Sequence, residues 1–185
     1  MKKYPFNSRA LLLLLALCLG LAACSESQQP PIDNDPEPFA SGDECHVCGM
    51  IIMDFPGPKG LAMEKNAVKK FCSTAELFGW WLQPENQILK ATLYVHDMTD
   101  TPWGSPDDRR LIDATTAYYV VGAVLKGSMG ATLASFADED KARQFATAHG
   151  GRVLRFDDID LELLQQEAKK QYNEALPHGD HHSGH

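Results

Sequence analysis

The stretch that decides the fold is LAMEKNAVKKFCSTAELFGWWL, residues 61–82. Leu61–Glu64 and Val68–Phe71 have the pattern of two short strands around a Lys65-Asn66 turn, which predicts a tight hairpin. Ser73–Glu76 has the pattern of a capping box, so a short helix is expected to begin there. Ala91–His96 then alternates apolar and polar side chains and predicts another strand. The order is therefore hairpin, helix, strand.

The second half of the chain repeats this order. Ala117–Leu125 is rich in β-prone residues, Lys126–Gly130 is a glycine turn, and Thr132–Phe136 predicts a returning strand. Asp138–His149 predicts a helix and Val153–Phe156 a closing strand. We expect an α+β fold made of two related β-β-α-β modules, at about 45–98 and 111–157. Two unrelated α+β halves are the alternative.

Three further features are expected in the folded part. Cys48–Phe55 is apolar and β-prone, so we expect a strand that ends at the turn Pro56–Gly60. Ser135 and Asp138 are expected to form the capping pair of the second helix. An amphipathic helix from about Asp158 to Ala175 is expected to close the folded part.

The N-terminus has the pattern of an export signal. Lys2, Lys3 and Arg9 form a positively charged region, and Ala10–Leu21 is almost purely apolar. A run of this length is too short for a stable membrane span and is typical of a signal peptide. We therefore expect residues 1–23 to be removed, with a retained anchor helix as the alternative.

The segment Leu21–Cys24 resembles a bacterial lipobox, which implies that Cys24 is lipidated after cleavage. Ser25 after this cysteine favours sorting to the outer membrane. Residues 24–44 are polar, acidic and rich in proline, so we expect a lipidated, extended tether. The folded domain at 45–175 would then lie on the periplasmic side of the bacterial envelope, in an oxidising compartment.

Composition excludes several classes of protein. The chain has 185 residues and a formal charge of −8, and loss of Lys2, Lys3 and Arg9 with the signal lowers it to −11. Such an acidic charge argues against nucleic acid as a partner, because phosphate binding needs a basic surface. Five cysteines are too few for a disulfide-dense scaffold.

The tail at residues 176–185 holds four of the seven histidines of the chain: His178, His181, His182 and His185. Imidazoles bind copper and zinc ions, so we expect auxiliary metal capture by this tail. A solvated segment without a metal role is the alternative.

The sharpest motif is CHVCGM, residues 45–50. Covalent haem attachment requires His directly after the second cysteine, where this chain has Gly49. A zinc site needs four ligands, and the chain has no second pair of cysteines after this motif. A thioredoxin-like pair would precede a helix, whereas a β-prone run follows Cys48. A structural disulfide between Cys45 and Cys48 remains open.

A Cu(I) site is the other interpretation, because Cu(I) prefers thiolate and thioether ligands. If the segment after Cys48 is extended, Cys48 and Met50 face the same side. Met129, in the glycine turn, is the candidate for a third ligand. Cys72 is expected to be buried and inert, and Met53, Met63 and Met98 are expected in the core.

The order of several short motifs resembles the NosL family over about residues 43–157. They are Cys48-Gly49-Met50, Pro56–Gly60, Phe71, Asp97-Met98 with Trp103, Ala117–Val120 and Met129-Gly130. The resemblance implies an exported lipoprotein that binds Cu(I) and helps to assemble the copper centres of nitrous oxide reductase, together with an ABC-transporter complex. It also implies a fold of two related β-β-α-β modules.

The resemblance implies that Cys48, Met50 and Met129 are the copper ligands. Cys45 is an addition to the family pattern and, with His46 beside the motif and His96 before Asp97, is a further candidate. We therefore expect a metallochaperone and not an enzyme. A periplasmic thiol oxidoreductase that uses Cys45 and Cys48 is the first alternative, and an envelope protein that binds zinc or heavy metals is the second. A Cys45–Cys48 disulfide is expected to compete with Cu(I).

Overall fold

The computed structural model describes residue 36 and residues 39–175. The chain divides into two units, Met1–Asn34 and Asp35–His185, and every described residue belongs to the second. The expected signal peptide, Cys24 and the histidine tail lie outside the described residues. None of the helices in the described part is long and apolar enough to cross a membrane.

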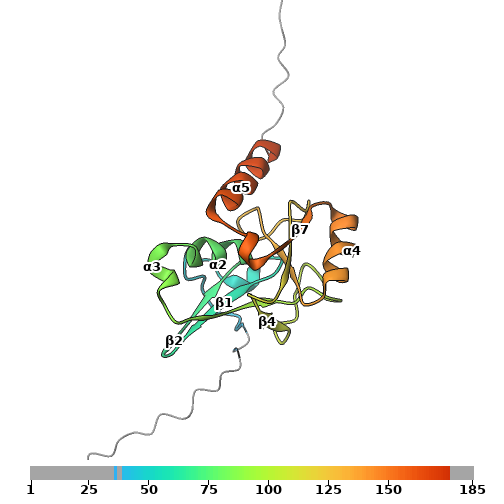
Figure 1. Cartoon of the computed structure of the whole chain (residues 1–185). Coiled ribbons are helices and arrows are strands. Elements are labelled where there is room, and N and C mark those ends of the chain that lie inside the picture. Colours follow the sequence, from blue (N-terminus) through green and yellow to red (C-terminus); the bar gives the residue numbers. More distant parts are fainter. Residues whose placement is uncertain (1–35, 37–38, 176–185) are drawn as a thin grey trace, which may run out of the picture. The chain divides into compact units, whose positions relative to one another are not determined.

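The first module is a four-stranded antiparallel sheet with two helices. Its strands lie in the order β2-β1-β3-β4, and α2 packs on β1 and β2 (Figure 1). The elements are β1 (Gly60–Glu64), β2 (Ala67–Phe71), α2 (Thr74–Trp81), α3 (Pro84–Gln87), β3 (Thr92–His96) and β4 (Leu111–Asp113). The short α3 and β4 were not expected from the sequence.

The second module is a three-stranded antiparallel sheet covered by one helix. Its strands lie in the order β6-β5-β7, so the first strand is again central, as β1 is between β2 and β3. The elements are β5 (Tyr118–Val121), β6 (Ala134–Phe136), α4 (Glu139–His149) and β7 (Arg152–Arg155). The short 3-10 helix η2 (Phe156–Asp158) and α5 (Leu161–Ala175) follow. This arrangement confirms the α+β fold of two β-β-α-β modules with a C-terminal helix.

Both main helices begin at side-chain caps. The Ser73 hydroxyl accepts a hydrogen bond from the Glu76 N–H at 3.1 Å, and Asp138 accepts one from the Lys141 N–H at 3.0 Å. These caps pair N–H groups that a helix cannot pair internally. The expectation that Ser135 shares in capping α4 is wrong, because its hydroxyl donates to the carbonyl of His96 at 2.6 Å.

Hydrogen bonds between distant residues join the two modules. The Thr74 hydroxyl donates to the carbonyl of Leu133 at 2.6 Å and accepts from the N–H of the same residue at 3.1 Å. The ring of Phe78 on α2 meets Tyr119 on β5 edge-on, with ring centroids 5.1 Å apart. All four side chains are buried, so one hydrophobic core continues from the first module into the second.

The strand expected at Cys48–Phe55 is wrong. The segment turns at Gly49, which has a φ of 71°, pairs with Glu44 through the single residue Ile51, and continues as the 3-10 helix η1 (Ile52–Asp54). Positive φ suits glycine, which lacks a Cβ. The apolar side chains here fill the core next to the sheet and do not extend it.

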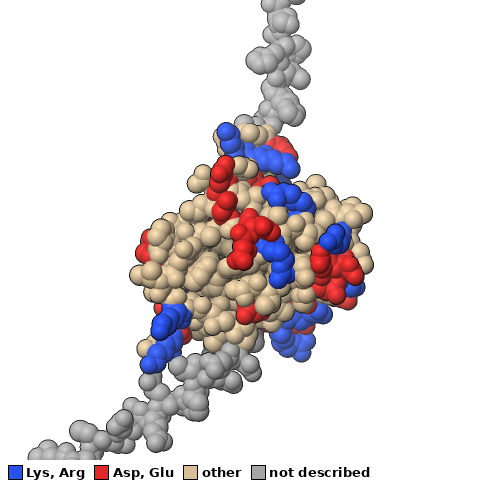
Figure 2. Space-filling view, viewed as in Figure 1, with Lys and Arg blue, Asp and Glu red and all other residues tan. Residues whose placement is uncertain are grey.

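Charge is distributed unevenly over the face shown in Figure 2. Acidic and basic side chains gather over α5, over α4 and near the tip of the β1–β2 hairpin. The area over α2 and α3 carries few of them.

Candidate metal centre

The CHVCGM motif forms a tight loop that is held against the end of strand β2. The N–H of Cys45 donates to the carbonyl of Met50, and the N–H of Gly49 donates to the carbonyl of Cys45, both at 2.9 Å. The N–H of His46 donates to the carbonyl of Lys70 on β2 at 2.8 Å. Because β2 ends one residue later, this bond places the loop beside Cys72.

A salt bridge holds the same loop from outside. The Lys70 ammonium group lies 2.6 Å from a carboxylate oxygen of Asp43, which comes just before the motif. Asp43 also accepts an N–H bond from Ala40 at 2.7 Å, and its carbonyl accepts one from Ile52 at 2.9 Å. The loop is therefore fixed to the sheet at several points before any metal binds.

Three cysteine sulfur atoms meet at this position. The Sγ atoms of Cys45, Cys48 and Cys72 all lie within 4.8 Å of one another, and those of Cys48 and Cys72 are 3.6 Å apart. All three cysteines are free thiols. The hydroxyl of Ser128, from the second module, donates to the Cys72 sulfur at 3.0 Å. We call Cys45, Cys48 and Cys72 the thiol cluster.

Only one thiol of the cluster is partly open to solvent. Cys45 is 3% exposed and Cys72 is fully buried, whereas Cys48 is half-buried. Cys48 therefore provides the route by which a metal ion or a partner's ligand can reach the cluster.

Neighbouring thiols and amides favour one negative charge in the cluster. A hydrogen bond from the Cys72 thiol lowers the pKa of Cys45, whereas burial of Cys45 raises it. Hydrogen bonds from the backbone N–H groups of Cys48, Cys72 and Val47 lower the pKa of Cys45 further. The same hydrogen bond and burial raise the pKa of Cys72. One thiolate is thus stabilised while a second proton is retained, which prepares the site for a soft cation.

A buried cation lies near this charge. The Lys59 ammonium group donates to the carbonyls of Phe55 at 2.6 Å and Pro56 at 3.1 Å. Burial lowers the pKa of Lys59 to about 8, against the effects of Cys72 and Asp108, which raise it. A neighbouring positive charge partly offsets the cost of a buried thiolate.

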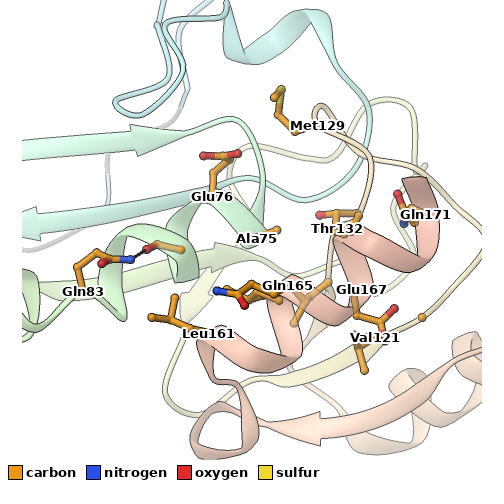
Figure 3. Close-up of a pocket in the computed structure, with 16 residues that line it drawn as sticks. Ala75, Glu76, Gln83, Val121, Met129, Thr132, Leu161, Gln165, Glu167 and Gln171 are labelled. Atoms are coloured by element: carbon orange, nitrogen blue, oxygen red, sulfur yellow. Dashed lines mark hydrogen bonds between the residues drawn. The ribbon is translucent and has the colours of Figure 1, made fainter. Parts of the chain in front are cut away.

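Glu76, in the first turn of α2, faces a pocket beside the cluster. Burial raises the pKa of this carboxyl group, and the charge on Cys45 raises it further. The pocket has a volume of about 300 Å³ and lies between α2, the segment before β6 and α5. Figure 3 shows Glu76 and Met129 at the same end of it.

Met129 lies at the edge of the pocket, in the turn that the sequence predicted. It directly follows Ser128, whose hydroxyl contacts Cys72, and its side chain is 58% exposed. The turn is closed by a bond from the Gly127 N–H to the Gly130 carbonyl at 2.9 Å. Trp103 also holds this turn, since its indole N–H donates to the carbonyl of Lys126 at 2.9 Å.

The other methionines differ from Met129. Met50 is half-buried and packs against the core at the end of the CHVCGM loop. Met53 and Met63 also pack against the core, and Met98 is buried, as expected. The turn at Gly49 replaces the extended geometry that was expected to align Met50 with Cys48.

The structure does not bring the two candidate histidines into the thiol cluster. The ring of His46 packs edge-on against Phe71 and Trp80, with centroids 5.9 and 6.1 Å away. His96 is buried on β3, where its Nδ1 accepts the Lys59 N–H at 3.2 Å and its Nε2 faces Asp108 at 3.4 Å. Burial lowers the pKa of His96 to about 3, so the ring is neutral.

Cys72 is buried, as expected, but its neighbours were not predicted from the sequence. Its sulfur lies within the thiol cluster. The available signal was its position directly between the end of a hairpin strand and the Ser73 helix cap.

The sequence of this chain is similar to proteins of one known family. The NosL family model matches residues 36–164. The copper-binding lipoprotein NosL of Stutzerimonas stutzeri is 58% identical over 179 residues, with 94% of each chain covered. The protein of the same name from Achromobacter cycloclastes is 35% identical over 157 residues, which cover 82% of this chain and 79% of that protein.

A solved structure agrees with the sequence comparisons. The crystal structure of the copper chaperone NosL from Shewanella denitrificans matches with a TM-score of 0.66 and 43% identity. The match covers 72% of this chain and 99% of that chain. The family model spans most of the folded part, and two relatives exceed 30% identity over most of the chain. The chain therefore belongs to the NosL family.

Proposed function

We propose that this protein is a carrier of Cu(I) whose metal is held by the thiol cluster. The observation that carries the proposal is the convergence of three cysteine sulfur atoms within 4.8 Å of one another. Soft thiolates select Cu(I), and a fixed trigonal set of sulfur atoms suits it. Cys48, Cys72 and Cys45 are the proposed thiol ligands, with Met129 as a thioether donor at the open side and Met50 as a further candidate.

Zinc fits this site less well. Structural zinc sites have four nitrogen, sulfur or oxygen ligands in a tetrahedron. Among the described His, Cys, Asp and Glu residues, only the three cysteines come together in this way. Methionine completes a copper site better than a zinc site, and the relatives are named as copper-binding proteins.

The carrier acts at the envelope in this proposal. Lipidation at Cys24 would hold it on the periplasmic side, with the outer membrane favoured by Ser25. The S. stutzeri relative, which covers 94% of this chain, is named a lipoprotein. Its client would be nitrous oxide reductase, reached with an ABC-transporter complex, as the family resemblance implies.

The deciding experiment is an anaerobic Cu(I) titration of the reduced protein against a competing chelator. We expect one tightly bound Cu(I) in the wild type and an affinity at least about 100-fold lower in Cys48→Ser, because a thiolate ligand is lost. Met129→Leu should weaken binding by about tenfold or less. Met53→Leu is the matched control and should bind as the wild type does. Unchanged affinity in Cys48→Ser would overturn the assignment.

A thiol oxidoreductase is the second candidate function. The observation in its favour is the 3.6 Å distance between the sulfur atoms of Cys48 and Cys72, beside a Cys45 whose pKa is lowered. Metal-free protein would then oxidise or reduce a dithiol substrate catalytically. We expect metal-free wild-type protein to turn over a dithiol substrate no faster than Cys48→Ser does.

The membrane anchor has its own test. Mass spectrometry of protein purified from membranes should find Cys24 as a lipidated N-terminus. Cys24→Ala should release the protein from the membrane fraction, and an unmodified Cys24 in membrane-purified protein would refute the anchor.

A further inference from the structure

The pocket between α2 and α5 offers hydrogen-bond acceptors but no positive charge. Its volume of about 300 Å³ is at the lower end of the range for pockets that hold a small ligand. None of the described residues that line it is Lys, Arg or His, and leucine and alanine side chains form much of its wall. The acids and amides among them are Glu76, Gln83, Gln165, Glu167 and Gln171. The pocket therefore suits a side chain with an apolar stem and a positively charged end.

Glu76 is the strongest of these acceptors, because its carboxylate is unpaired. The Ser73 hydroxyl caps α2 by accepting the Glu76 N–H at 3.1 Å. The reciprocal bond of a capping box, from the Ser73 N–H to the carboxylate, is not formed, and no other described residue donates to this carboxylate. The side chain lines the pocket instead (Figure 3). A half-buried carboxylate without a donor is costly, and an incoming cation would offset that cost.

A second acceptor in the pocket also lacks a donor. The side-chain oxygen of Gln171 is buried and has no hydrogen-bond partner among the residues that the structure describes. Gly130 lies against it, since a Cβ at that position would be 2.9 Å from this oxygen. Figure 3 shows Glu76 on α2 and Gln171 on α5. Unpaired acceptors therefore come from both helices that form the pocket, and each of them favours an incoming N–H group.

We propose that this pocket receives the side chain of an arginine presented by the protein that exchanges copper with the thiol cluster. The guanidinium group donates to the Glu76 carboxylate, its remaining N–H groups face the acceptors of α5, and its methylene groups pack on the apolar wall. The proposal rests on the proposed Cu(I) function, because it describes the partner of that site.

The distribution of the acceptors favours arginine over lysine. A guanidinium group presents five N–H donors in a planar fork and is weakly hydrated, so it can pair with acceptors on two sides of a pocket. A lysine ammonium group is compact and strongly hydrated, and it loses more hydration when it enters an apolar wall. A carboxylate and a guanidinium group also form short, charge-assisted hydrogen bonds.

The pocket is placed so that a bound arginine brings its own protein to the open side of the metal centre. Met129 lines the pocket and is 58% exposed, and the preceding Ser128 contacts the Cys72 sulfur at 3.0 Å. A metal ligand near the partner's arginine is then held at a high effective concentration beside the cluster. Copper moves by exchange of ligands and stays Cu(I), and the protons that leave the accepting thiols return to the thiols that release the metal.

The first test is a titration of the metal-free, reduced full-length chain with a short arginine peptide, followed by amide NMR. Acetyl-glycyl-arginyl-glycine amide should bind in about the millimolar range or tighter and shift the amides of Ala75, Glu76, Thr132 and Gln171. The matched peptide with citrulline in place of arginine has the same shape without the charge. It should bind at least about tenfold more weakly. Equal binding of the two peptides, or of a lysine peptide, would overturn the proposal.

Variants of the protein locate the binding. Glu76→Gln keeps the backbone cap of α2 and should weaken the arginine peptide by at least about fivefold. Glu85→Gln is the matched control, because Glu85 is an exposed acid on α3 outside the pocket, and it should change nothing. Ala168→Phe adds a ring at an exposed position that lines the pocket and should abolish binding without a change in charge. Wild-type affinity in Glu76→Gln and Ala168→Phe would overturn the site.

The second test connects the pocket to copper. The Cu(I)-loaded chain is mixed without oxygen with a peptide in which glycines join two cysteines to a terminal arginine, or with its citrulline counterpart. The copper that remains on the protein is measured after rapid gel filtration. The arginine peptide should remove copper at least about fivefold faster from the wild type, and the two rates should be equal in Glu76→Gln.

The outcomes separate this proposal from the function on which it rests. Equal removal of copper by both peptides from the wild type would overturn the role of the pocket while the Cu(I) function stands. A wild type that binds no Cu(I) in the chelator titration would overturn the proposed function and, with it, the copper-exchanging partner, even if the arginine peptide still binds.

Discussion

The two modules share a topology but differ in the connection between their first two strands. In the first module β1 and β2 are joined by the two residues Lys65 and Asn66, since Glu64 pairs directly with Ala67. In the second module β5 ends at Val121 and β6 begins at Ala134, so a long segment separates them. That segment carries Ser128 and Met129 to the first module.

This difference assigns different tasks to the modules. The first supplies all three cysteines of the cluster, from the loop before β1 and from the residue after β2. The second supplies a hydroxyl group to Cys72 and an exposed thioether at the edge. Two modules with a similar strand order therefore form one site because the connections between their first two strands differ.

Oxidation should have the largest effect, because it removes two thiols of the first module together. We expect a mild oxidant such as diamide to take two electrons and join Cys48 to Cys72, whose sulfur atoms need to approach from 3.6 Å to about 2 Å. Oxidised protein should bind no Cu(I), and reductant should restore binding. Thiol counting and peptide mapping check this result.

Cys45→Ser distinguishes between two disulfides. A Cys48–Cys72 bond still forms in this variant, so oxidation should still block Cu(I). The Cys45–Cys48 bond that the motif spacing favoured would make the variant resistant to oxidant. Persistent Cu(I) loading of oxidised Cys45→Ser would therefore support the sequence-based hypothesis and contradict ours.

The next largest effect separates the contributions of the two modules to copper affinity. Cys72→Ala should lower Cu(I) affinity by about 100-fold or more, since a thiolate ligand is lost. Ser128→Ala removes only a hydrogen bond to that sulfur and should lower affinity by about tenfold or less. Competition titrations measure the Cu(I) affinity of both variants. If Cys72→Ala and Ser128→Ala lose the same amount of affinity, Cys72 is not a ligand.

Asp97→Asn should loosen the junction between the modules. The carboxylate accepts N–H bonds from Thr99 at 3.0 Å and from Ala137 at 3.2 Å, and it pairs with Arg110 at 2.8 Å. We expect a loss of about 1–3 kcal/mol in the free energy of unfolding, measured by urea denaturation at pH 7. Asp107→Asn is the control, because Asp107 forms an exposed ion pair with Arg109. It should leave the midpoint of urea denaturation unchanged.

The same carboxylate should make stability depend on pH. Burial raises the pKa of Asp97, but hydrogen bonds from Thr99, Arg110 and Ala137 outweigh it, and the net change is downward. A pKa that is lowered by folding stabilises the protein at a pH above the pKa of the unfolded chain, near 3.9. This stabilisation is lost as the pH falls through the pKa of the folded state. The difference between wild type and Asp97→Asn should therefore shrink below about pH 4. A difference that stays constant would contradict this role.

The smallest effect is expected at the support of the second module's turn. Trp103→Phe keeps an aromatic ring against Phe145 but removes the hydrogen bond to the Lys126 carbonyl. We expect a loss of about 1 kcal/mol in stability and a decrease of a few-fold in Cu(I) affinity, because Ser128 and Met129 are held less firmly. Thermal melts and competition titration measure the two values. A loss of stability in Trp103→Phe without any change in Cu(I) affinity would show that Met129 does not contribute to the site.

Elements with strong local signals could be predicted. The turn between β1 and β2, the Ser73 cap of α2 and the Asp138 cap of α4 are where the sequence indicated. Each depends on residues within about four positions of one another, so a short window contains the cause. The apolar run after Cys48 was misassigned because Gly49 turns the chain and the segment packs beside the sheet.

The sequence by itself determined the two related modules, the caps of their helices and a pair of cysteines in one short motif. Only the tertiary structure decided that Cys72, 24 residues from Cys48, joins that pair, and that Ser128, 56 residues further, contacts it. It also placed His96 in the core, with its ring nitrogens facing Lys59 and Asp108. Local patterns depend on neighbours along the chain, whereas these contacts depend on strand register, on the bond between His46 and Lys70, and on the packing of one module against the other.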